Sequence, residues 1–249
     1  MYSRCFNFSV YRLIKGCALT TLFIAPDLAY AAITEEEMEL NCLKVDKYAT
    51  EGGRYYGLKQ YPKARSQYEL QVGWSESCQL DEDKIAMAYN NVALTYVHEG
   101  DILRAKAWLN ILPNDKRSTF NLNKINNNIK TAVEELSSEP GGQYWRYSGA
   151  ALWNSIIIKP HGRNYKIDFF GFYAGLMAMY GGPNSGEFST VLEFKNGKAH
   201  YAMNDDNEGD CQYDFDIDDE LLTVTRVAGG SCGFGHNVSA EGIYHKVES

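Results

Sequence analysis

The hexapeptide SSEPGG, Ser137 to Gly142, decides how this chain is divided. Its serine, proline and glycine content predicts a linker. Before it, residues 34–137 repeat apolar side chains with the three-to-four-residue period of amphipathic helices. After it, short runs rich in Tyr, Phe, Val, Ile and Thr alternate with turn residues, which is typical of strands. We therefore expect an α+β protein of two domains, with a helical domain at 32–136, a linker at 137–142 and an antiparallel β domain at 143–249.

Residues 1–31 have the pattern of a cleaved signal peptide. Early basic residues lead into a mostly apolar run, Gly16–Ala25, and AYA at residues 29–31 is a cleavage pattern. A bilayer span needs about 20 apolar residues, so we expect no stable membrane insertion after cleavage. A lipid anchor at Cys17 is the alternative, but Lys15 interrupts its motif. The short basic leader favours a periplasmic or secreted protein of a Gram-negative bacterium.

Charge narrows the class of partner. Removal of residues 1–31 shifts the formal net charge from -8 to near -10, because three basic residues and one acidic residue leave. An acidic exported protein is a poor binder of nucleic acid or of anionic membranes. We therefore expect a protein partner, with a basic protein as the candidate, and no cofactor.

The helical domain contains two stretches that align on each other. Each has a small residue, an aromatic three positions later, an apolar residue after a turn, then alanine and a large side chain. This pattern resembles the tetratricopeptide repeat, in which small residues let two antiparallel helices approach closely. The matched residues are Gly52, Tyr55, Tyr61, Ala64 and Tyr68 in the first stretch and Ala93, Tyr96, Ile102, Ala105 and Leu109 in the second.

The resemblance is incomplete. Lys59 occupies a turn position where the family favours glycine, and about seven residues beyond the family's usual 34-residue spacing fall within 75–83. A last helix, with apolar residues spaced from Leu122 to Leu136, is expected to cap the array. An ordinary helical bundle is the alternative that the same periodicity permits.

The mature chain retains four cysteines, and an even number in an oxidising compartment favours two disulfides. If the first hairpin turns at 60–62, Cys42 and Cys78 lie side by side at its open end, so we expect them to bridge. Such a bridge would stabilise the fold by about 3 to 4 kcal/mol on the chain-entropy model. Cys211 and Cys232 flank a predicted hairpin centred on 217–220, and we expect a second bridge between them.

The β domain is expected to form a small barrel or sandwich of about eight strands. Asn196-Gly197 lies between two strand runs, which is the strongest short signal for a hairpin. The strands are expected at 144–148, 152–158, 165–173, 187–194, 199–203, 211–216, 221–227 and 238–247.

The general shape of this domain, over about 100 residues, resembles small β domains of uncharacterised bacterial envelope proteins, some of them lysozyme-inhibitor-like. The resemblance rests on a Tyr-Ser-Gly opening at 147–149, CGFG at 232–235 and a closing Gly-Ile-Tyr at 242–244. The inhibitory loop motifs of those proteins have no match here. The resemblance therefore implies a fold and assigns no functional residue.

An acidic segment between two of the strands is a candidate partner surface, formed by Asp205, Asp206, Glu208 and Asp210. Calcium binding is an alternative, but glycine stands fifth where an EF-hand requires a ligand, and strands replace its helices. Solvated turn residues are the plainest interpretation.

No enzyme motif is convincing. Cys232 and His236 are spaced for a thiol–imidazole pair, but a catalytic cysteine needs a free thiolate, which the expected bridge removes. The histidines show no metal-ligand spacing. We therefore expect a non-enzymatic protein-binding protein, such as an inhibitor or immunity protein against an envelope-acting hydrolase or toxin. An envelope assembly or secretion accessory factor is the second hypothesis, and an enzyme using Cys232 and His236 is the third.

Overall fold

The computed structural model describes residues 34–136, 139–175, 178, 182–203, 210–230 and 232–249. The expected signal peptide at 1–31 and the serines of the expected linker lie outside them and stay predictions. The chain from Ala32 to Ser249 forms one compact unit.

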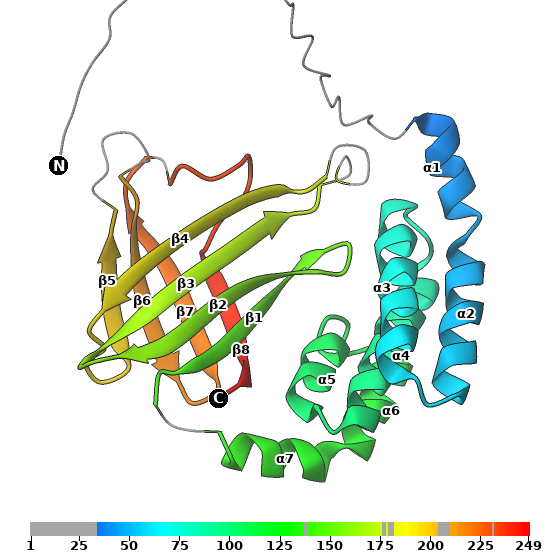
Figure 1. Ribbon diagram of the computed structural model, residues 1–249, viewed down its shortest axis with the longest axis horizontal. Helices are drawn as coiled ribbons and strands as arrows, with labels where there is room; N and C mark the ends of the chain where they lie inside the picture. The colour runs from blue at the N-terminus through cyan, green and yellow to red at the C-terminus, as the bar shows by residue number, and fades with distance from the viewer. Residues whose placement is uncertain (1–33, 137–138, 176–177, 179–181, 204–209, 231) are drawn as a thin grey trace, which may run out of the picture. The chain divides into compact units, whose positions relative to one another are not determined.

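Seven helices lie in the described part of the N-terminal half (Figure 1). None of the helices described is long and apolar enough to cross a membrane. They are α1 Glu35–Cys42, α2 Val45–Gly57, α3 Tyr61–Ser77, α4 Glu82–Glu99, α5 Ile102–Leu109, α6 Lys116–Lys124 and α7 Asn126–Glu134.

Side-chain caps determine where several helices begin. Thr34 Oγ1 accepts a hydrogen bond from the Glu37 amide at 3.2 Å, and the Glu37 carboxylate accepts one from the Thr34 amide at 2.8 Å. This reciprocal pair is a capping box, which satisfies two amides that the first turn leaves without helical partners. Asp81 caps α4 through the Lys84 amide, and Gly100 ends α4 in the left-handed region at φ 80°.

The small residues of the two aligned stretches lie inside the helix packing. Ala64, Ala93 and Ala105 are fully buried. A Cβ added to Gly52 would lie 2.4 Å from Tyr68 Cε1, so only glycine leaves room for this ring. The helix α2 packs on α3, α3 on α4, and α4 on α5. Close approach of backbones is therefore what holds this half together.

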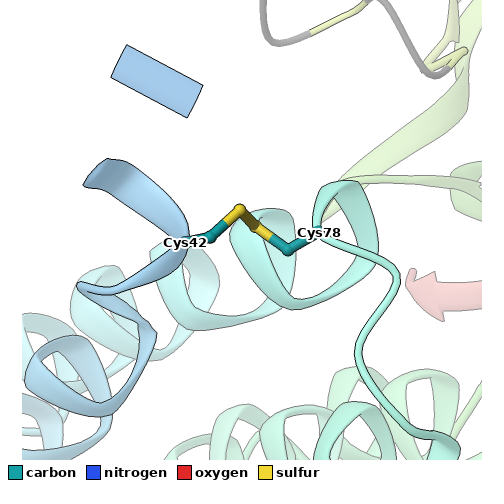
Figure 2. Close-up of a disulfide and its surroundings, with 2 residues drawn as sticks. All are labelled: Cys42 and Cys78. Atoms are coloured by element: carbon teal, nitrogen blue, oxygen red, sulfur yellow. A yellow bond between two sulfur atoms is a disulfide. The ribbon is translucent and has the colours of Figure 1, made fainter. Parts of the chain in front are cut away.

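One local feature differs from the sequence expectations. The last helix is broken into α6 and α7 at Ile125, which has φ -100° and ψ 9°. Asparagines, which are weak helix formers, flank this point on both sides. The helix α3 has 17 residues, so that Cys78 lies at its C-terminal cap. There it forms a disulfide with Cys42, with their Cα atoms 5.8 Å apart (Figure 2), which is the expected pairing.

The C-terminal half is an antiparallel, nearly closed barrel-like sheet of eight strands (Figure 1). The order is β4-β3-β2-β1-β8-β7-β6-β5, so neighbouring strands are adjacent in sequence except where β1 meets β8. All eight expected strands are present, although the last begins at Gly242 and not at Val238. They are β1 Gly142–Gly149, β2 Leu152–His161, β3 Asn164–Tyr173, β4 Asn184–Leu192, β5 Lys198–Ala202, β6 Gln212–Asp218, β7 Leu221–Ala228 and β8 Gly242–Glu248.

The strands β4 and β5 are joined by a tight turn but do not form a ladder. Asn196 and Gly197 both have positive φ, as the Asn-Gly signal predicts, and Lys195 pairs with Lys198 in an isolated bridge. The Gly197 carbonyl then accepts a hydrogen bond from the Ile217 amide at 2.9 Å, and β5 continues on β6. The expected hairpin therefore opens after its turn, and its two strands become the edges of the sheet.

Two apolar clusters form the core. The β cluster is built from large side chains such as Tyr144, Phe169 and Phe215, all of them at most 1% exposed. The helical cluster surrounds Trp108 and also takes in Tyr147 and Trp153 from the strands β1 and β2. The helices and the sheet thus share part of one apolar cluster.

Candidate functional site

A groove between α4 and α6 is the candidate binding site of the helical half. It has a volume of about 520 Å³. The helix α4 packs on both α5 and α6, and the groove runs between α4 and α6. Its lining combines apolar, amide and basic side chains, namely Met87, Asn90, Asn91, Leu94, Lys116, Arg117, Phe120 and Asn121.

Buried amides form the floor of this groove. Asn90 is 3% exposed, and its Nδ2 donates to the Ala86 carbonyl at 2.8 Å and to Ser118 Oγ at 3.0 Å. Its Oδ1 accepts from Asn121 Nδ2 at 2.8 Å. Buried polar side chains are costly unless they are satisfied in this way. The network therefore holds α4 and α6 at a fixed separation.

Apolar side chains stand exposed on the walls. Phe120 on α6 is 65% exposed and Met87 on α4 is 36% exposed. A phenyl ring in water forgoes the stabilisation that burial of its surface would bring. Exposed apolar side chains gathered around a groove mark a place where another chain can pack.

A charged cluster lies at one end of the groove. Arg117 donates both Nη atoms to the Asp83 carboxylate, at 2.8 and 2.9 Å, and Lys116 Nζ lies 3.6 Å from Asp83 Oδ1. The hydrogen bonds from Arg117 lower the pKa of Asp83. The guanidinium is thereby held in place, whereas the Lys116 side chain is 78% exposed.

A carboxylate near the C-terminal end of α3 joins the helices to the sheet. Glu76 Oε1 accepts hydrogen bonds from the hydroxyls of Tyr89, at 2.7 Å, and of Tyr147. Glu76 Oε2 accepts from the Ala150 amide at 2.6 Å. Burial, followed by the Glu76 charge, raises the pKa of both tyrosines, so they stay protonated and remain donors. Sequence reasoning missed Glu76 because nothing near it in the chain marks its partners.

The candidate acidic surface falls mostly outside the described residues. Asp205, Asp206 and Glu208 are among those not described. Asp210 is exposed, and its Oδ1 accepts a hydrogen bond from the Gly230 amide at 2.7 Å. Asp210 therefore has a turn-stabilising contact, and the partner surface as a whole stays a prediction.

The second cysteine pair, Cys211 and Cys232, consists of two thiols in this structure. Cys211 is buried and Cys232 is partly buried, with no bond between them. The Cys211 thiol nevertheless lies within hydrogen-bonding reach of Cys232. The expected bridge thus stays a prediction, with both partners already side by side.

The CGFGHN segment covers part of the free edge of β4. The Gly235 amide donates to the Ser185 carbonyl at 2.9 Å, and Asn184 Nδ2 donates to the His236 carbonyl at 2.9 Å. The Phe234 ring packs inward on Phe169, with centroids 5.5 Å apart. The contact that places His236 is therefore made by its backbone.

The sequence carried one signal for the α4–α6 groove. Asn90, Asn91 and Asn121 lie inside helices, where asparagine is unfavourable because it competes for backbone hydrogen bonds. Such residues indicate that their side chains have hydrogen-bond partners elsewhere in the fold. Their meeting could not be deduced, because it depends on how α6 returns to α4.

The fold and these sites define a class of protein: a helical array with an exposed groove, joined to a barrel-like antiparallel sheet. Among the residues that the structure describes, no group of three or more His, Cys, Asp or Glu side chains could hold a metal ion. The chain matches no protein-family model, no curated protein and no solved structure in the comparisons made.

Proposed function

We propose that this protein is an exported, non-enzymatic binding protein that holds a segment of a partner protein in the groove between α4 and α6. The observation that carries the proposal is Phe120, which is 65% exposed beside a floor of hydrogen-bonded amides. Because Asn90 is hydrogen-bonded to both Ser118 and Asn121, the floor keeps its shape without a ligand. The exposed ring then offers an anchor for an apolar side chain of the partner, in the manner of groove-binding peptides.

The helical half is best interpreted as a tetratricopeptide-like array. Two successive helix pairs, α2–α3 and α4–α5, support this, together with the packing of α4 on α6 and of α5 on α7. The small residues at equivalent positions of the first two pairs support it further. In such an array, the first helix of each pair faces the bound segment. Met87 lies on such a helix, α4, and Phe120 lies across the groove from it on α6.

The partner we propose is basic, because the mature chain is expected to be acidic. Within that class, an envelope-acting hydrolase or toxin is the candidate, and this protein would be its inhibitor or immunity protein. Charge reversal at Asp205, Asp206 and Glu208 tests the partner's charge. If the charge-reversed variant binds the partner more weakly at low salt than the unchanged protein does, a basic partner is supported, since salt screens such attraction. Unchanged binding would remove the acidic surface from the proposal.

Site-specific photo-crosslinking tests the groove. A photo-reactive amino acid at position 120 is compared with one at Leu58, an apolar residue at the end of α2 with a similar exposure of 57%. We expect a discrete crosslinked species from position 120 in the periplasm and none from position 58. The same species from both positions, or none from either, would contradict binding in the groove.

A further inference from the structure

Cys211 and Cys232 differ in how far a molecule from solvent can reach them. Cys211 is 0% exposed. Cys232 is partly exposed and lines a pocket of about 600 Å³, together with residues of β3 and β4 and with Met203. This volume is within the range of small-molecule pockets. One sulfur of the pair can therefore meet a small ligand, and the other cannot.

The groups around the two thiols favour reaction at Cys232. The Tyr213 hydroxyl lies 3.1 Å from Cys232 Sγ. Burial raises the pKa of Tyr213, so its phenol keeps its proton and can donate to a Cys232 thiolate. Such donation stabilises the charged form of a thiol. Burial, and then the hydrogen bond with Cys232, raises the pKa of Cys211 to about 12, which keeps Cys211 protonated.

The backbone holds the two cysteines together without a bond between them. Cys211 directly precedes β6, and β6 pairs with β7 as far as Gln212 opposite Ala228. Gly229 then passes so close that an added Cβ would lie 2.2 Å from the Asp210 carbonyl oxygen. The Gly230 amide donates to the Asp210 side chain at 2.7 Å. A bond between the sulfurs could form and break while this framework stays in place.

We propose that Cys211 and Cys232 form a thiol–disulfide exchange site that takes a low-molecular-weight disulfide in the pocket beside Cys232. The Cys232 thiol loses its proton and its sulfur attacks one sulfur of the incoming disulfide. A Cys232–ligand disulfide forms, and the first ligand thiolate leaves and takes a proton. Cys211 then loses its proton and attacks Cys232 Sγ, and the second ligand thiolate leaves and takes up a proton. Two cysteines are oxidised and one disulfide is reduced to two thiols.

This role separates the pair from Cys42 and Cys78. The latter bridge joins the end of α1 to the end of α3 and lines no pocket among those described. Structural disulfides resist reduction by small thiols, whereas exposed ones exchange. Mild reduction of the mature protein is therefore expected to open Cys211–Cys232 first and to leave Cys42–Cys78 closed.

The test uses the mature protein with Cys42–Cys78 intact and oxidised glutathione as the probe. Intact-mass spectrometry should show Cys211→Ser accumulating one glutathionyl adduct at Cys232, because no resolving thiol remains. Cys232→Ser should react at least about tenfold more slowly, because its remaining thiol, Cys211, is buried and protonated. The unchanged protein should lose two thiols without a lasting adduct. Equal rates for the two variants, or no adduct on Cys211→Ser, would overturn the proposal.

Tyr213→Phe provides a second variant that keeps both sulfurs. Without the hydroxyl, the sulfur of Cys232 loses a hydrogen-bond partner that lies 3.1 Å away, so the oxidation rate should fall about threefold. Circular dichroism establishes that each variant is folded. A rate equal to that of the unchanged protein would show that the phenol does not assist Cys232, and would count against the exchange site.

Discussion

The helical half and the β half are packed from opposite kinds of side chain. The helices meet through Gly52, Ala64 and Ala93, where the absence of bulk is what permits contact. The sheet closes over large rings such as Phe169 and Phe215, where bulk is what fills the interior. Adding bulk at Gly52 and removing bulk at Phe169 should therefore both destabilise the protein, because the first contact needs a small side chain and the second needs a large one.

The largest expected effect is the loss of a ring from the β core. Phe169 is fully buried and packs against Phe188 at 5.3 Å and Phe234 at 5.5 Å between ring centroids. Phe169→Ala should lower the free energy of unfolding by about 3–5 kcal/mol. Urea denaturation measures this, with Phe170→Ala as the control, because Phe170 is adjacent in β3 but 42% exposed. Equal losses for both would mean that the interior does not depend on its large rings.

A smaller effect is expected when one methyl group is added to the helical half. Gly52→Ala places a Cβ against Tyr68 and should cost about 1–3 kcal/mol, although alanine favours helix. Gly57→Ala in the same helix meets nothing within 4 Å. Gly57→Ala should stabilise the protein by about 0.5–1 kcal/mol, because its only effect is to lower the backbone entropy of the unfolded chain. Thermal melts of the two variants should therefore move in opposite directions, and a gain in both would show that α2 and α3 are not in close contact.

The smallest effect concerns pH and the sheet. Burial, followed by the Lys106 charge, lowers the pKa of His245 from its ordinary 6.5. The unfolded chain then binds this proton more readily, so stability is fully present above about pH 6.5 and is lost as the pH falls toward the lowered value. His245→Gln should reduce the drop in Tm between about pH 7.5 and about pH 5. His161→Gln, at an exposed position, should leave that drop unchanged.

The strand pattern could be predicted because each strand carries its own signal. In β6, Tyr213 and Phe215 are buried and Asp214 is exposed, which is the alternation that the sequence displays. The first disulfide could also be predicted, because a helical hairpin fixes which residues lie at its open end. Local periodicity and turn chemistry were sufficient in both cases.

Features that depend on distant parts of the chain could not be predicted. Asn196-Gly197 correctly indicates a turn, but the contact of Gly197 with Ile217 decides that β4 and β5 separate beyond it. The groove depends on Asn90 meeting Asn121, which no local pattern specifies. The sequence likewise predicts a last strand that begins at Val238, directly after CGFGHN, whereas CGFGHN covers part of the edge of β4 and the strand begins at Gly242.

The C-terminal end of α3 has a consequence for engineering. Glu76 lies near this end, and there it engages Tyr147 and the Ala150 amide of the β half. A chimera that kept the helices but shortened α3 before Glu76 would lose the acceptor for those donors. We therefore expect transplantation of the sheet onto another helical array to succeed only if residues 75–83 are moved with it.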